Sequence, residues 1–194
     1  MEGSIFIAGA GVQWLRDRMK FFKKAPETEK IVKSLQNNND IYLVPAFTGL
    51  GAPYWDANAR GVLSGITRDT SPKEIVRATI EAVAYQTHDL FEAMKHDGLR
   101  PKIVKVDGGM VMNNWFSQFL SDIVNVKVLR PKVQETTALG AAFMAGLNIG
   151  VYKSLKDISK NWQLDKKFSS KMKNSSRNIL IDGWEKAVKR ALIN

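Results

Sequence analysis

The sequence predicts an α/β fold, in which helices cover a sheet, and two runs of the chain carry that prediction. Residues 102–109 alternate like a strand and end in two glycines just before a helix begins. Residues 61–70 form a second expected strand, which leads into a long helix that starts at Pro72. From residue 102 to residue 146, strand, helix, strand and helix alternate, as in a sheet covered by helices.

The first elements expected along the chain are a strand at residues 5–8 and a helix that follows the glycines of residues 9–11. A strand so near the start suggests a start codon placed inside an older reading frame. A charged stretch, residues 23–40, comes next and contains another short helix around residues 31–35.

Strands at residues 41–44 and 62–66 flank an aromatic loop, and we expect them to form an antiparallel pair. We interpret the loop itself, residues 45–60, as mainly structural, because its Gly-Leu-Gly is a weak phosphate-binding signal. The helix expected at residues 137–145 is rich in alanine and contains Gly140, so it can approach its neighbours closely.

The long helix has a well-specified start. Ser71 and Glu74 make a capping box, and Pro72 occupies the first helical position. A stripe at helical spacing follows at Val76, Ile80, Val83, Thr87, Leu90 and Met94. With further apolar residues beside this stripe, the apolar face is wide enough to predict a helix sandwiched between other elements.

The turn after residues 102–109 is the strongest local signal for a ligand. A strand that stops at Gly-Gly lets the backbone come close to a bound molecule and aims free N–H groups at an anion. Asn113, four residues after Gly109, falls in the first helical turn, where its amide could reach the same ligand. The helix shows its apolar stripe at Met112, Trp115, Phe116, Phe119, Leu120 and Ile123. Taken alone, the motif also fits a tight turn without a ligand.

Composition excludes several classes of protein. The chain has 194 residues, 44% of them hydrophobic, which suits a single domain with its own core. It has no cysteine, so a disulfide framework and a thiolate metal site are both excluded. His88 and His96 are a poor pair for a metal, and we assign no metal ligand. No apolar run approaches a membrane span and no signal-peptide pattern is present, so we expect a cytoplasmic protein without a membrane partner.

The net charge of +10 is concentrated at the carboxy-terminal end. Residues 151–194 hold eleven Lys and Arg against four Asp and Glu, which is a surplus of seven positive charges. Nucleic-acid binders usually add an identifiable module or interleaved aromatic residues, and neither is found here. We therefore interpret the basic residues as solvated charge and expect no nucleic-acid partner.

Residues 61–81 resemble the signature of the FGGY carbohydrate kinases, matching it in spacing from the paired glycines to Glu81. Three further segments are similar to the glycerol kinase group of that family: residues 44–56 with 59–61, Arg130-Pro131, and residues 137–142. The likeness runs from about residue 3 to residue 150 and resumes at residues 183–190.

The resemblance implies an actin- and ribonuclease-H-like nucleotide-binding domain, the FGGY carboxy-terminal domain, truncated at its amino terminus. Residues 1–150 would be this domain, incomplete at its start. Residues 151–194 would be a basic tail with a terminal helix, and within it residues 155–181 match the family poorly.

The resemblance also implies a function, the transfer of the γ-phosphoryl group of ATP to glycerol. Gly9, Gln13, Gly109 and Asn113 match family positions that contact ATP. Each pair is a glycine followed four residues later by an amide side chain at a helix start. In the complete enzyme, Mg²⁺ would offset the phosphate charge.

The family's catalytic base is an aspartate in a Gly-Asp-Gln run, which lies before the point where this chain begins. Asp56 and Asp107 do not match it, and an aspartate at a turn is more often a cap. We therefore assign no catalytic residue and expect the isolated chain to be inactive. Three readings stay open: an inactive relict, half of a split kinase that needs a separate amino-terminal chain, and a non-catalytic basic interaction module.

Overall fold

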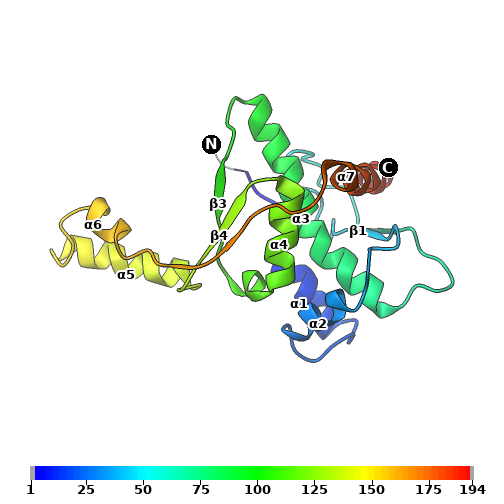
Figure 1. Ribbon diagram of the computed structural model, residues 1–194, viewed down its shortest axis with the longest axis horizontal. Coiled ribbons are helices and arrows are strands. Elements are labelled where there is room, and N and C mark those ends of the chain that lie inside the picture. Colours follow the sequence, from blue (N-terminus) through cyan, green and yellow to red (C-terminus); the bar gives the residue numbers. More distant parts are fainter. Residues whose placement is uncertain (1–2, 193–194) are drawn as a thin grey trace.

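The structure is a computed structural model that describes residues 3–192. A group of helices surrounds the long helix α3, and an arm made of α5 and α6 extends from it (Figure 1). The elements, in chain order, are α1 (Gly9–Asp17), α2 (Glu27–Lys33), β1 (Tyr42–Val44), β2 (Val62–Ser64), α3 (Pro72–His96), β3 (Ile103–Lys105), the 3₁₀ helix η1 (Gly109–Met112), α4 (Asn114–Val124), β4 (Lys127–Pro131), α5 (Thr136–Asn148), α6 (Leu155–Ser159), β5 (Leu164–Phe168) and α7 (Asn174–Ala191).

Helix α3 is the centre of the core and begins as the sequence predicts. Ser71 Oγ accepts the Lys73 N–H, Glu74 Oε2 accepts the Ser71 N–H at 2.9 Å, and Pro72 is the first helical residue. Residues 76–86 of this helix are all buried, because α1, α2, α4 and β1 pack around it. The predicted sandwiching is confirmed.

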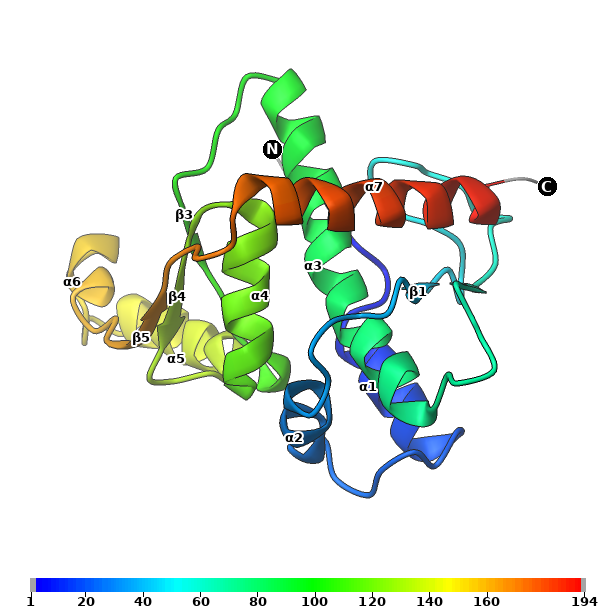
Figure 2. The same ribbon diagram turned by 45° about the vertical axis from the view of Figure 1, so that its right-hand side comes forward.

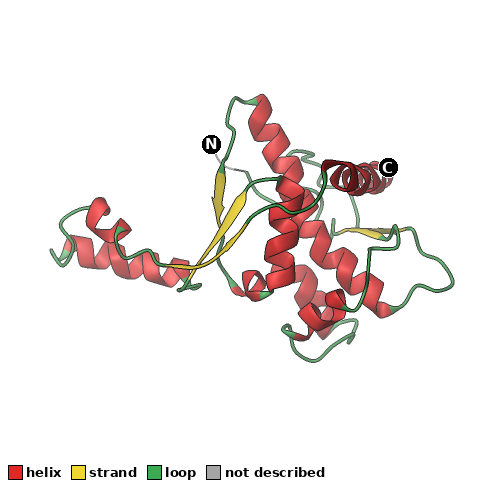
Figure 3. Ribbon diagram, viewed as in Figure 1, coloured by secondary structure: helices red, strands yellow, loops and turns green. Residues whose placement is uncertain are grey.

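Two small sheets lie beside the helices (Figure 3). Strands β1 and β2 pair antiparallel, with Leu43 opposite Leu63, so the predicted antiparallel pair is confirmed. The second sheet has the order β3-β4-β5, in which β3 and β4 are parallel and β4 and β5 antiparallel. The predicted alternation of strand and helix between residues 102 and 146 is confirmed as well.

Two predictions near the amino terminus differ from the structure. Residues 5–8 form no strand, because no described strand lies beside them to complete a ladder. Their backbone makes hydrogen bonds outside a sheet, since Ile7 O accepts a hydrogen bond from Gln86 Nε2 at 3.3 Å. The helix expected at residues 31–35 starts earlier, as α2 at Glu27. The Glu27 carboxylate accepts the Lys24 N–H at 2.6 Å and so helps to set that start.

The prediction for residues 137–145 is wrong in its packing. The helix forms, as α5, but within it only Gly146 is buried in the described structure. A Cβ built on Gly140 would meet no atom within 4 Å, so no neighbouring element packs closely against this glycine. The arm in Figure 1 gives the reason, because α5 stands away from the helices around α3.

Residues 151–192 add the short helix α6, the strand β5 and the helix α7 to the fold. Strand β5 extends the second sheet, and α7 lies across α3 and α4 (Figure 2). Trp184 of α7 is fully buried, stacks on Tyr85 and donates from Nε1 to Asp89 Oδ2 at 2.7 Å. The predicted terminal helix therefore forms, as α7, while the domain boundary at residue 150 stays a prediction.

Candidate functional site

A cavity of about 440 Å³ lies between α1, α2 and the turn that η1 makes before α4. Gly9, Gln13, Gly109 and Asn113, which come from two segments far apart in the sequence, all line it. Its apolar wall includes Val12, Pro26, Ile80 and Met110. A cavity with apolar walls and a few converging polar groups has the form of a small-molecule site.

A wider groove of about 830 Å³ lies between residues 36–40, α4 and α7, and none of the four predicted residues lines it. Arg77 lines this groove, but its guanidinium already donates to Glu81 at 2.6 Å and to Leu35 O at 2.8 Å. Because that charge is engaged within the protein, the smaller cavity is the better candidate for an anionic ligand.

The two predicted glycines each begin a helix at the cavity. Gly9 is the first residue of α1, and Gly109 is the first residue of η1. A Cβ built on either one would meet no atom within 4 Å. Between strand β3 and η1, Gly108 has a φ of 82°, which favours glycine and makes the sharp turn.

The amino terminus of α1 is suited to an anion. Its N-cap residue, Ala8, makes no side-chain capping bond, so the first N–H groups of the helix lack that partner. The helix dipole places partial positive charge at the same point. Gln13, one turn after Gly9, lines the same cavity and is exposed.

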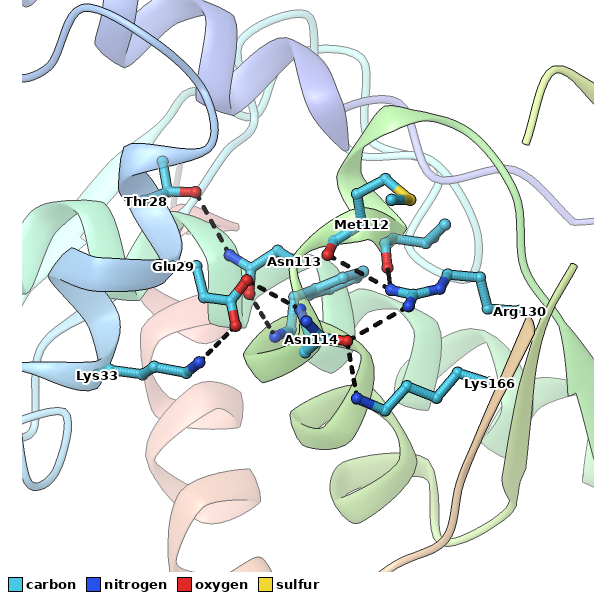
Figure 4. Close-up of polar contacts among 10 residues, drawn as sticks. Thr28, Glu29, Lys33, Met112, Asn113, Asn114, Arg130 and Lys166 are labelled. Atoms are coloured by element: carbon cyan, nitrogen blue, oxygen red, sulfur yellow. Dashed lines mark hydrogen bonds and ion pairs between the residues drawn. The ribbon is translucent and has the colours of Figure 1, made fainter. Parts of the chain in front are cut away.

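Asn113 lies one residue earlier than predicted, at the N-cap of α4 instead of in its first turn. The reason is that residues 109–112 form the separate 3₁₀ helix η1. Asn113 Oδ1 accepts the Phe116 N–H at 3.0 Å, and Asn113 Nδ2 donates to Thr28 Oγ1 at 3.3 Å (Figure 4). Each end of the amide retains capacity for one further hydrogen bond.

Glu29 of α2 occupies the start of α4 beside Asn113. Its carboxylate accepts the Asn114 N–H at 3.3 Å and pairs with Lys33 at 2.5 Å (Figure 4). Burial opposes ionisation, but these hydrogen bonds hold the pKa of Glu29 below its ordinary value of 4.5. A carboxylate at this point disfavours a second anion next to it, in contrast to the start of α1.

Arg130 of β4 holds the turn from the other side. It is 6% exposed and donates to Asp165 Oδ2 at 2.7 Å and to Val111 O at 2.8 Å. It also reaches Asn114 Oδ1 at 3.4 Å, and Lys166 Nζ reaches the same oxygen at 3.1 Å (Figure 4). Strands β4 and β5 therefore anchor the backbone that carries Gly109 and Asn113.

These supporting residues escaped the sequence analysis. Thr28 and Glu29 lie 85 residues from the side chains and backbone that they bond, and nothing in their local spacing indicates it. The resemblance included Arg130 only as part of a dipeptide. Its burial beside an acidic residue of β5 depends on a strand pairing that periodicity cannot show.

The rejected aspartates have structural partners. Asp56 Oδ1 accepts the N–H groups of Asn58 and Ala59 at 2.8 and 3.0 Å, which is the turn role expected of it. Asp107 accepts from the Thr136 hydroxyl. Among residues 3–192, no group of three or more His, Cys, Asp or Glu side chains is arranged to hold a metal ion. No helix in that part of the chain is long and apolar enough to cross a membrane.

Comparison with known proteins gives consistent matches. Glycerol kinase 1 of Pseudomonas aeruginosa is 55% identical over 190 residues, covering 98% of this chain and 38% of that protein. A glycerol kinase of Clostridium botulinum is 52% identical over 193 residues, covering 99% of this chain and 39% of that protein. The chain thus spans about two fifths of the length of the curated relatives it matches.

Solved structures agree in fold. The crystal structure of Plasmodium falciparum glycerol kinase with ADP has a TM-score of 0.86 at 38% identity, covering 98% of this chain and 38% of that one. A ligand-bound xylulose kinase from Lactobacillus acidophilus has a TM-score of 0.77 at 23% identity, covering 97% of this chain and 38% of that one. At that identity the second match shows the fold alone, and the predicted fold class is confirmed.

The family model that matches the chain describes the FGGY family of carbohydrate kinases, C-terminal domain, and it covers residues 1–149. This is well over half of the 194 residues. The chain therefore belongs to the FGGY family of carbohydrate kinases and corresponds to that family's C-terminal domain.

Proposed function

We propose that the chain is the ATP-binding, carboxy-terminal part of a glycerol kinase, an enzyme that transfers the γ-phosphoryl group of ATP to glycerol and forms glycerol 3-phosphate. The observation that carries the proposal is the cavity of about 440 Å³ lined by Gly9, Gln13, Gly109 and Asn113. The 52–55% identity to glycerol kinases supports the choice of glycerol as the acceptor. We assign this site to residues 1–150 as the nucleotide-binding domain, in a cytoplasmic protein.

The nucleotide has a preferred direction in this cavity. Its phosphates lie toward Gly9, where the start of α1 has no side-chain cap. Its nucleoside lies toward Asn113, because the Glu29 carboxylate repels phosphate from the start of α4. The free N–H and free oxygen lone pair of Asn113 can meet a base edge that offers one acceptor and one donor, as adenine does.

The described residues do not supply a Mg²⁺ site here. Glu29 is the one carboxylate lining the cavity, and it is already engaged by Lys33 and by the Asn114 N–H. Mg²⁺ is usually held by one or two carboxylates together with substrate phosphates. We therefore assign no step on this chain to the metal, and no residue on it to the general base.

Nucleotide binding tests the proposal directly. The cavity is one wall of the site that a complete kinase would close, so we expect the 194-residue chain to bind ADP at about 1 mM or more weakly. Titration of the chain and of Asn113→Ala with ADP measures this. Binding in the micromolar range that survives Asn113→Ala would show that the site is wrongly assigned.

A second test concerns the part of a glycerol kinase that this chain does not contain, since the chain covers 38–39% of the relatives' length. The 194-residue chain should form no glycerol 3-phosphate from MgATP and glycerol when assayed by itself. Addition of a separately expressed amino-terminal glycerol kinase fragment should restore turnover. Turnover by the chain alone, above a buffer control, would contradict both statements.

A further inference from the structure

Thr28 lies in the first turn of α2, and its hydroxyl has a fixed direction. The residue is 4% exposed, and its Oγ1 donates to Ala25 O at 2.7 Å. A hydroxyl has a single proton to donate, so this bond leaves Thr28 Oγ1 only its lone pairs for any other partner. The other partner is Asn113, whose Nδ2 lies 3.3 Å away. Thr28 can therefore face Asn113 only as an acceptor.

The opposite end of the same amide is held by the backbone. Asn113 Oδ1 accepts the Phe116 N–H at 3.0 Å. If the amide turned over, Nδ2 would face the Phe116 N–H, two donors in contact, and Oδ1 would face the lone pairs of Thr28. Both contacts would be unfavourable, so the two partners together allow one orientation of Asn113 (Figure 4).

A separate contact keeps α2 in place. Glu29 accepts the Asn114 N–H at 3.3 Å and pairs with Lys33, and neither bond involves Thr28. Val32, one turn further along α2, is fully buried in the core. Removing the Thr28 hydroxyl should therefore lower the cost of turning the Asn113 amide over, since the bond from the Phe116 N–H is left to hold it, without releasing α2 from α4.

We propose that Thr28 is a positioning residue that fixes the amide of Asn113 and thereby makes the cavity selective for adenine over guanine nucleotides. The inference rests on the proposed function. A fixed amide presents its N–H and its oxygen in one order, which matches the acceptor and donor edge of adenine. Guanine carries the reverse order on its Watson–Crick edge, a donor at N1 and an acceptor at O6, so the fixed amide meets donor with donor and oxygen with oxygen. An amide that can turn over presents the order that guanine needs.

The test compares Thr28→Val, which keeps the shape and loses the hydroxyl, with Thr28→Ser, which keeps the hydroxyl. The dissociation constants for ADP and GDP are measured by NMR titration of the 194-residue chain. The unaltered chain should prefer ADP by about tenfold, Thr28→Val should reduce this preference to about threefold because the bond from Phe116 remains, and Thr28→Ser should retain it. The ratio of the two constants is decisive, because a general loss of structure weakens both nucleotides alike.

Val32→Ala serves as the control, since it weakens the packing of α2 and does not line the cavity. It should lower the melting temperature and leave the ADP preference unchanged. If Thr28→Val does not fold, Thr28→Ala carries the same comparison. A Thr28 variant without the hydroxyl that keeps the original ratio overturns the inference and leaves the proposed function standing. A chain that binds neither nucleotide overturns both.

Discussion

Gly109 is a residue at which the effect of a substitution on ligand binding can be measured apart from its effect on stability. It begins η1, it lines the cavity, and a Cβ built on it would meet no atom within 4 Å. Its φ lies outside the left-handed region, so its backbone conformation is open to other residues. Glycine here is therefore unnecessary for the fold, and we propose that it admits the close approach of a ligand.

Gly109→Ala should weaken ADP binding by about tenfold, because the added methyl group takes up room in the cavity. The melting temperature should stay the same or rise slightly, since alanine restricts the unfolded chain more than glycine does. Gly140→Ala in α5 is the matched control: its Cβ also meets no atom within 4 Å, and it does not line the cavity. Equal ADP affinity in both variants would remove Gly109 from the site.

At the scale of single elements, the start of α3 depends on one ionised side chain. Glu74 Oε2 accepts both the N–H and the hydroxyl of Ser71, at 2.9 and 2.6 Å. Burial opposes its ionisation, but these hydrogen bonds hold the pKa of Glu74 below its ordinary value of 4.5. The folded-state pKa thus lies below the unfolded one. The carboxylate stabilises the fold above the unfolded value, and this contribution is lost as the pH falls through the folded value.

Glu74→Gln should therefore lower the melting temperature at about pH 6 by a few degrees, the equivalent of ~1 kcal/mol for a lost cap. The difference between the variant and the unaltered chain should shrink as the pH falls through the lowered folded-state pKa of Glu74, because the carboxyl then becomes neutral like the amide. Thermal unfolding followed by circular dichroism at several pH values measures it. Because both proteins share all other carboxylates, a difference that does not depend on pH would exclude the ionised cap as its cause.

At the scale of the whole molecule, the arm of α5 and α6 is the part with the least burial. Met144 is 62% exposed and Ile149 75% exposed, with Val151 and Leu155 nearby and similarly open. The other helices of Figure 1 gather around α3, whereas this arm has solvent around most of its apolar surface. A patch of this kind on a single chain favours association.

The 194-residue chain should therefore elute well above its 21.7 kDa monomer mass in size-exclusion chromatography. The double substitution Met144→Lys with Ile149→Lys should shift elution toward the monomer. Ile179 of α7 is also exposed, and replacing it by lysine should not shift the elution. Co-expression with an amino-terminal glycerol kinase fragment should improve solubility. A soluble monomer with a cooperative transition would show that residues 23–40 and the other segments complete the domain.

Features that depend on neighbours in the sequence could be predicted. The capping box of α3 and the apolar stripe of α4 both follow from residues three or four apart, where helical geometry decides the contact. The resemblance to FGGY kinases supplied Gly9, Gln13, Gly109 and Asn113 together. Periodicity alone would have yielded only the turn at Gly109.

Features that depend on partners far along the chain were decided by the tertiary structure. Residues 5–8 have the composition of a strand, but a strand forms only beside another one, and none is there among the described residues. The sequence of α5 contains the same apolar residues whether or not a neighbouring element covers them, so it does not show that they are exposed. The bond from Asn113 to Thr28 joins residues 85 positions apart. The local pattern of this chain thus determined its helices, its turns and its family, because their geometry is set within a few residues. Which surfaces are covered, and which way the amide of Asn113 points, was decided only by folding, because contacts between distant segments leave no period in a sequence.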